Sequence, residues 1–210
     1  MMRILIADDH AVVRDGVKKI LEELPGEVTY GEARTAQEAL RLVHEENWDI
    51  VVLDISLGGR SGLEVLKELK HVRPKLPVLI LSMHSEEQYA SRAFKAGAAG
   101  YITKDSSRAE LIKAINKVIK GGRYVSLTLA EKLVFDMERG TDRPPHEALS
   151  DREFEVMNLI ALGKTVSEIA EMLSLSDKTI STYRARILKK MGMNTNAELT
   201  RYALKNGLVD

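Results

Sequence analysis

The chain has no cysteine, so it can form neither a disulfide framework nor a thiolate zinc site. No apolar run approaches the roughly 18 residues that a membrane-spanning helix needs. The first residues, Met1-Met2-Arg3-Ile4, are strand-like and lack the apolar core of a signal peptide. We therefore expect a cytoplasmic protein that has no membrane partner.

The chain also lacks an excess of charge of either sign, because 31 Lys and Arg residues balance 31 Asp and Glu residues. Overall charge therefore does not indicate nucleic-acid binding, and any site for a polyanion must be local. Residues 178–190 meet this condition, since they contain five basic side chains and no acidic one. A length of 210 residues favours two small domains over one large domain.

Apolar, strand-like runs alternate with helical patterns over residues 1–122. The expected strands are 3–7, 28–33, 50–53, 77–81 and 100–103. The expected helices are 12–24, one that starts at Thr35, one from Ser61 to before Pro74, 86–96 and 108–120. Thr35 with Glu38, and Ser61 with Glu64, have the spacing of a capping box. Five such units predict a doubly wound parallel sheet with helices on both faces.

Polar side chains stand where these strands end. They are Asp8, Asp9, Asp54, Ser82 and Lys104. In a doubly wound sheet these positions meet at one edge, where the strand order reverses. Three carboxylates so close repel one another unless a cation neutralises them, and a set of oxygen ligands fits Mg²⁺. An aspartate beside Mg²⁺, a lysine and a hydroxyl is suited to accepting a phosphoryl group as an acyl phosphate.

This pattern resembles the receiver domain of two-component response regulators, and the resemblance covers residues 3–122. It implies a flavodoxin-like α/β fold with five parallel strands. It also implies that Asp54 is the phosphoacceptor and that a sensor histidine kinase is the phosphoryl donor. The ligands of Mg²⁺ would be Asp8, Asp9, Asp54 and the main-chain carbonyl of Ser56.

The resemblance implies three further roles in the same site. Lys104 would pair with the phosphate, and Ser82 would hydrogen-bond a phosphoryl oxygen. Tyr101 would be the switch residue, an aromatic side chain that turns inward when Ser82 moves. We expect His10, beside the two acids, to be a packing or surface residue, because Mg²⁺ prefers oxygen ligands.

The chain departs from the family pattern next to the phosphoacceptor. Many receivers have proline four residues after it, whereas this chain has Gly58, which should loosen the loop. Ser56 and His84 occupy positions that in the family tune the lifetime of the acyl phosphate. His84 could position water or shield the phosphate, and the sequence leaves both roles open.

The segment 123–146 is predicted to connect two domains. Residues 128–139 have apolar side chains at helical spacing and should form a connecting helix. The polar run 140–145 is rich in Gly and Pro and is typical of a linker. We therefore place a receiver domain at 1–122 and a second domain at 147–210.

The second domain is predicted to contain four helices, which makes it all-α. Three capping-box spacings start at Ser150, Thr165 and Thr195, and the expected helices are 151–162, 166–173, 178–191 and 196–206. Only three residues separate the second helix from the third, which fits a helix-turn-helix. The exposed side of the third helix presents small and basic side chains that can enter a major groove, namely Lys178, Ser181, Thr182, Ala185, Arg186 and Lys189.

Residues 149–209 are similar to the LuxR-type (NarL/FixJ) helix-turn-helix output domain. The motifs that carry the similarity include Leu149-Ser150-Asp151-Arg152-Glu153 and Lys189-Lys190-Met191-Gly192. It implies that the third helix reads double-stranded DNA and that the fourth mediates dimer contacts. Bases would be read by Ser181, Thr182 and Ala185. Phosphates would be held by Lys178, Thr179, Lys189 and Lys190.

The positions that would read bases depart from those of several relatives. Several of them have Lys at the position of Ser181 and a longer polar residue at that of Ala185. Readout could therefore shift to Arg184 or Arg186, which lie on or beside the same face.

The resulting hypothesis is a transcriptional regulator that phosphorylation of Asp54 switches on. Phosphorylation would drive the formation of a homodimer that binds paired promoter half-sites. The alternative is a phosphorylation-independent regulator that uses the receiver only for dimerisation. A phosphatase of the aspartyl-phosphate type also uses Asp, Lys and Mg²⁺. It usually needs an Asp-x-Asp motif and a substrate cap, whereas Asp8 and Asp9 are adjacent, so we do not expect an enzyme.

Overall fold

The computed structural model describes residues 1–57, 60–127, 129–131 and 144–209. It forms two compact units that divide after Glu131, here called the first unit and the second unit. Among the described helices, none combines the length and the apolar character that a membrane crossing requires. Of the predicted connecting helix 128–139, residues 129–131 are described and are helical, while its other residues and residues 140–143 of the predicted linker lie outside the described residues.

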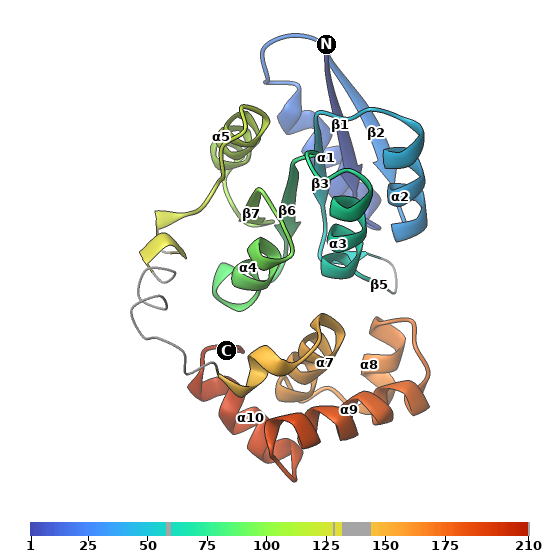
Figure 1. Cartoon of the computed structure of the whole chain (residues 1–210), viewed down its shortest axis with the longest axis vertical. Helices are drawn as coiled ribbons and strands as arrows, with labels where there is room; N and C mark the ends of the chain where they lie inside the picture. The colour runs from blue at the N-terminus through green and yellow to red at the C-terminus, as the bar shows by residue number, and fades with distance from the viewer. Residues whose placement is uncertain (58–59, 128, 132–143, 210) are drawn as a thin grey trace. The chain divides into compact units, whose positions relative to one another are not determined.

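The first unit is built on five parallel strands (Figure 1). They are β1 (Met2–Ala7), β2 (Val28–Ala33), β3 (Ile50–Leu53), β6 (Val78–Ser82) and β7 (Gly100–Thr103). Their order is β2-β1-β3-β6-β7, so the chain changes direction across the sheet between β1 and β3. All four residues of β3 are buried, as its continuous apolar run predicts. The predicted fold class is confirmed.

Five helices cover the two faces of this sheet. They are α1 (Ala11–Leu21), α2 (Ala36–Glu45), α3 (Gly62–Val72), α4 (Glu86–Lys95) and α5 (Arg108–Ile119). Helices α1 and α5 bury their apolar stripes against alternate residues of the strands, such as Ile4 and Ile6, and α2 and α3 lie on the other face (Figure 1). Tyr124 joins the core under α1 and α5 and forms an isolated bridge with Gly100.

One predicted helix cap in the first unit is wrong. Thr35 does cap α2, since its hydroxyl accepts a hydrogen bond from the Glu38 N–H at 3.2 Å. Ser61 makes no side-chain cap bond, because it belongs to β5 (Arg60–Ser61). This short strand pairs antiparallel with β4 (Ser56–Leu57), which the sequence pattern did not indicate.

In the described part of the second unit, four helices follow a 3₁₀ turn, η1 (Pro145–Ala148). The helices are α7 (Asp151–Ala161), α8 (Val166–Met172), α9 (Asp177–Met191) and α10 (Asn196–Lys205). All three predicted capping boxes form, at Ser150, Thr165 and Thr195. The short connection between α8 and α9, together with the buried Ile169 and Ile180, produces the expected helix-turn-helix.

Candidate functional site

The carboxyl edge of the sheet brings three of the predicted side chains into direct contact. The Lys104 Nζ lies 2.7 Å from Asp8 Oδ2 and 2.8 Å from Asp54 Oδ2. Asp8 and Asp54 are each only 3% exposed. Main-chain bonds extend the sheet beyond its strands, since Asp54 N–H donates to Ala7 O at 2.9 Å and Lys104 N–H to Ser82 O at 2.7 Å. We call Asp8, Asp9, Asp54 and Lys104 the acidic site.

Burial dominates the electrostatics of this site. It raises the pKa of Asp54 from its ordinary value of 3.8 to about 6, although the hydrogen bond and charge of Lys104 act in the opposite direction. Burial lowers the pKa of Lys104, but its bonds to Asp54 and Asp8 outweigh that effect, so its pKa is raised overall. Both groups are therefore charged at neutral pH, and Asp54 carries the negative charge that a nucleophile needs.

The acidic site has the donor chemistry that Mg²⁺ requires. Ligand atoms of Asp8, Asp9, His10 and Asp54 all lie within 4.8 Å of one another. Three of them are carboxylate oxygens, which are hard ligands suited to Mg²⁺. The Ser56 N–H donates to the Asp54 carboxylate, so β4 begins beside the site. Gly58, the predicted departure from the family pattern, lies outside the described residues.

His10 is at the surface, as predicted, but it also contacts the acids. Its side chain is 67% exposed, and its Nδ1 lies 2.7 Å from Asp9 Oδ1 and 3.3 Å from Asp8 Oδ1. Its main-chain N–H donates to Asp8 Oδ1 at 2.8 Å. Sequence reasoning missed these contacts, although its position next to two acids was a signal.

The predicted switch residues are linked through the main chain of His84. The buried Ser82 hydroxyl accepts a hydrogen bond from the His84 N–H at 3.1 Å, and the buried Tyr101 hydroxyl donates to the His84 carbonyl at 2.9 Å. Tyr101 therefore points inward. The His84 ring stacks on Tyr89 with a centroid distance of 4.5 Å. Burial and the Lys104 charge lower the pKa of His84, so this ring is neutral at pH 7.

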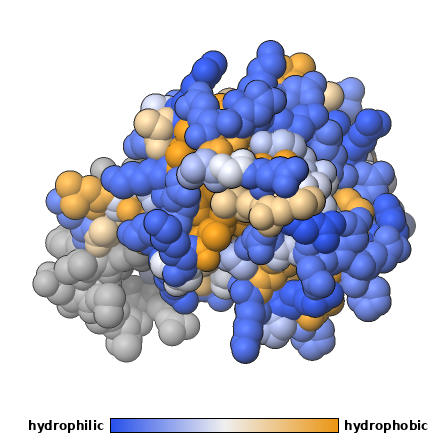
Figure 2. All heavy atoms as spheres, turned by 90° about the horizontal axis from the view of Figure 1, so that it is seen from above, coloured by the Kyte–Doolittle hydropathy of each residue, from blue (hydrophilic) through white to orange (hydrophobic). Residues whose placement is uncertain are grey.

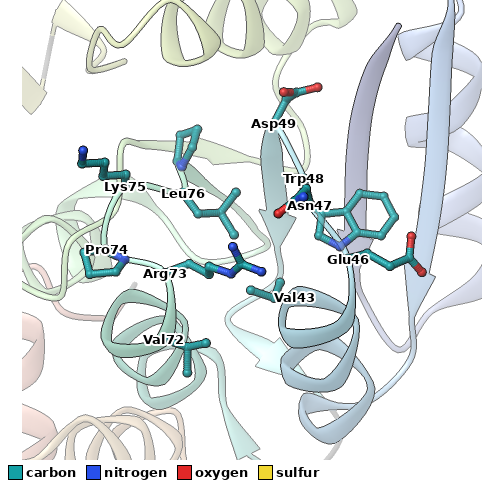
Figure 3. Close-up of a pocket in the computed structure, with 11 residues that line it drawn as sticks. Val43, Glu46, Asn47, Trp48, Asp49, Val72, Arg73, Pro74, Lys75 and Leu76 are labelled. Atoms are coloured by element: carbon teal, nitrogen blue, oxygen red, sulfur yellow. The ribbon is translucent and has the colours of Figure 1, made fainter.

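A separate hollow of about 530 Å³ lies at the opposite, amino-terminal edge of the sheet (Figure 3). Figure 2 looks onto this edge and shows hydrophobic residues within a mainly hydrophilic surface. Trp48, which lines the hollow, already donates its Nε1–H to Leu42 O and has the Arg3 guanidinium 4.8 Å from its ring centre. The reactive groups gather at the acidic site and not here, so we take the acidic site as the functional one.

The predicted DNA-contacting residues all lie on α9, but they differ in their exposure and in whether they are paired. The exposed ones are Lys178, Ser181, Thr182, Ala185, Arg186, Lys189 and Lys190, and we call them the basic face. Thr179 and Arg184 are half-buried. Arg184 Nε donates to Asn196 Oδ1 at 2.6 Å, and the Lys190 ammonium lies 2.6 Å from Glu153 Oε2. Within the described chain, Lys178, Arg186 and Lys189 have no charged partner, so they are the cations available to a polyanion.

Two known families match this chain, one in each unit. Residues 4–116 match the response regulator receiver domain, and residues 147–203 match the bacterial regulatory proteins of the luxR family. The chain belongs to the LuxR-type response regulators. As a two-component response regulator, it acts in transcription regulation through a helix-turn-helix DNA-binding domain.

The similarity to individual response regulators extends over the whole chain. The response regulator GacA of Pseudomonas protegens is 35% identical over 210 residues, which are 100% of this chain and 99% of that protein. The response regulator UvrY of Escherichia coli K12 is 34% identical over 209 residues, 99% and 96% of the two chains. RcsB of Salmonella enterica serovar Typhimurium, solved on a promoter with a phosphomimetic, aligns with a TM-score of 0.60, 27% identity and 98% of both chains.

The two lysines at the end of α9 should behave differently when each is replaced by alanine. Lys189→Ala removes an exposed, unpaired cation, so the slope of log affinity against log salt should fall by about 1, without loss of stability. Lys190→Ala should change this slope less and should lower stability by about 1–2 kcal/mol, because it removes the partner of the Glu153 carboxylate, whose side chain is only 5% exposed. Filter binding at several salt concentrations and thermal unfolding measure the two effects. Equal slopes for both variants would contradict this assignment.

Proposed function

We propose that Asp54 receives a phosphoryl group from a sensor histidine kinase and that this event drives dimerisation and promoter binding. The observation that supports the proposal best is the Lys104 ammonium between two buried carboxylates at the carboxyl edge of the sheet. A cation held there can neutralise the phosphoryl oxygens as they arrive. The proposed ligands of Mg²⁺ are Asp8, Asp9, Asp54 and the Ser56 carbonyl.

The transfer breaks the N–P bond of the donor phosphohistidine and forms an O–P bond to Asp54. The ionised Asp54 provides the attacking oxygen, and the donor imidazole leaves with the electron pair of the broken bond. Bound Mg²⁺ supplies positive charge that offsets the charge of the phosphoryl group and of the acids. Lys104 orients one side of the group, and the Ser82 hydroxyl can donate to a phosphoryl oxygen.

The proposed output is DNA binding by a dimer. It would take place in the cytoplasm, where the protein can meet both the kinase and the promoter. One small module buries only about 600–1,000 Å² on DNA, so two half-sites held by a dimer would supply the missing affinity. The basic face would enter the major groove, with phosphate contacts from Lys178, Thr179 and Lys189. The proposed domain limits are 1–122, 123–146 and 147–210.

Phosphorylation of the full chain by acetyl phosphate tests this function. With Mg²⁺ present, we expect the mass of one phosphoryl group, a dimer in analytical ultracentrifugation, and at least about tenfold tighter promoter binding. A chelator should prevent all three. Labelled protein that binds DNA no better than unlabelled protein would contradict the proposal and favour a receiver that serves only for dimerisation. Steady turnover of phosphate esters would instead indicate an enzyme.

A further inference from the structure

Arg14 is a buried cation that the proposed phosphoryl transfer does not use. It is 3% exposed and lies on the buried stripe of α1 together with Val17 and Leu21. A charged side chain is almost never buried so deeply unless it is paired. Its guanidinium has two fixed partners: Nη1 donates to the main-chain oxygen of Asp8 at 2.8 Å, and Nε donates to Glu32 Oε2 at 2.8 Å.

Glu32 holds this guanidinium from the edge strand of the sheet. It lies in β2, opposite Ile6 of β1, so the register places it close to the acidic site. Hydrogen bonds from Arg14 and then Lys18 lower the pKa of Glu32, so its carboxylate stays ionised. Lys18 binds the other carboxylate oxygen at 2.7 Å. The Arg14 charge is thus matched by Glu32 and need not cancel the charge of the acids that would hold the metal.

The contact with Asp8 completes the anchoring of the turn between β1 and α1. The Asp8 N–H donates to Ala33 O at 3.1 Å, and the Asp8 carbonyl accepts the hydrogen bond from Arg14. The Asp8 carboxylate is then oriented by the His10 N–H and by Lys104. This turn has to hold Asp8 and Asp9 close to Asp54 against their mutual repulsion, which is a reason for a strong main-chain anchor.

We propose that Arg14, held in place by Glu32, is a positioning residue for the divalent cation of the acidic site. The inference rests on the proposed Mg²⁺ site and adds the residues that set its geometry. Groups that orient metal ligands from outside commonly change affinity by about 10- to 100-fold when they are removed. A guanidinium suits this role because its rigid, flat fork carries two separate donors, Nε for the Glu32 carboxylate and Nη1 for the Asp8 carbonyl.

Isothermal titration calorimetry of the full chain with Mg²⁺ tests the inference without phosphorylation or DNA. We expect Arg14→Gln to weaken binding by about tenfold or more and Glu32→Gln by a smaller factor. Arg14→Lys should lie between Arg14→Gln and the wild type. Lys18→Gln is the matched control, because Lys18 contacts the same carboxylate but not Asp8. It should bind Mg²⁺ within about twofold of the wild type.

Circular dichroism at the titration temperature shows whether each variant is folded. A folded Arg14→Gln variant with wild-type Mg²⁺ affinity would overturn the inference and leave Arg14 a role in stability alone. If Arg14→Gln does not fold, Glu32→Gln decides, and an affinity equal to that of Lys18→Gln would overturn the inference. A wild-type protein that takes up no Mg²⁺ would instead overturn the proposed metal site itself.

Discussion

Replacing Asp54 by asparagine should reduce phosphoryl incorporation from acetyl phosphate by at least about a hundredfold. The amide has no ionised oxygen to attack phosphorus, whereas Asp54 is charged at neutral pH and lies 2.8 Å from the Lys104 ammonium. Intact-protein mass spectrometry after timed incubation measures the effect. Asp105→Asn is the control, since Asp105 is an exposed carboxylate next to Lys104 and should label normally. Label retained on Asp54→Asn would remove Asp54 from the proposal.

The same variant should reveal the cost of burying a charge at the acidic site. Folding raises the pKa of Asp54 from 3.8 to about 6, so the folded state favours the protonated acid. The stability from this group is therefore complete below pH 4 and is lost as the pH rises through 6, a change of about 3 kcal/mol. Asparagine does not titrate. The stability of Asp54→Asn relative to the wild type should thus increase between pH 4 and pH 7. The gain is somewhat smaller than this change, because Lys104 loses one of its two partners.

Denaturant unfolding at several pH values measures this difference. The first unit must be followed by a signal of its own, for example hydrogen exchange of β3, because the protein has two units. A stability difference that stays constant from pH 4 to pH 7 would show that Asp54 keeps its ordinary pKa in the folded protein.

Local patterns explain how much of the fold the sequence could predict. Asp54 directly follows the run 50–53. The continuous apolar strand predicts burial, and the acid after it predicts the position of the sheet edge. The capping boxes of the second unit are contacts between residues three apart, so they too are visible in the sequence. Ser61 has the same spacing but fails, because pairing of β5 with β4 takes that residue into a strand.

Contacts that join distant segments could not be predicted in this way. Lys190 and Glu153 are 37 residues apart, so the sequence could not show that this predicted phosphate contact is paired with an acid in the protein without DNA. Arg14 meets Glu32 only because β2 pairs with β1 under α1. Sequence did hold one unused signal: Arg14 stands on the apolar stripe of α1, where a charge needs a buried partner.

Gly62→Ala should damage the acidic site through the main chain alone. Gly62 is the first residue of α3, and a Cβ there would lie 2.1 Å from the Asp54 main-chain oxygen and 2.7 Å from the Ile55 Cα. Neither atom belongs to a flexible side chain, so the segment that carries Asp54 must move. We expect a loss of stability of about 3 kcal/mol, at the upper end for overpacking, and at least about tenfold slower labelling of Asp54.

A second glycine provides the matched control for this prediction. Gly16 lies within α1, and a Cβ built there meets no heavy atom within 4 Å among the described residues. Gly16→Ala should therefore stabilise the first unit by about 0.5–1 kcal/mol, because alanine loses less backbone entropy than glycine in a helix. Denaturant unfolding and acetyl phosphate labelling of both variants compare the two sites. Equal effects at Gly16 and Gly62 would show that close contact with the Asp54 carbonyl is not what requires glycine at position 62.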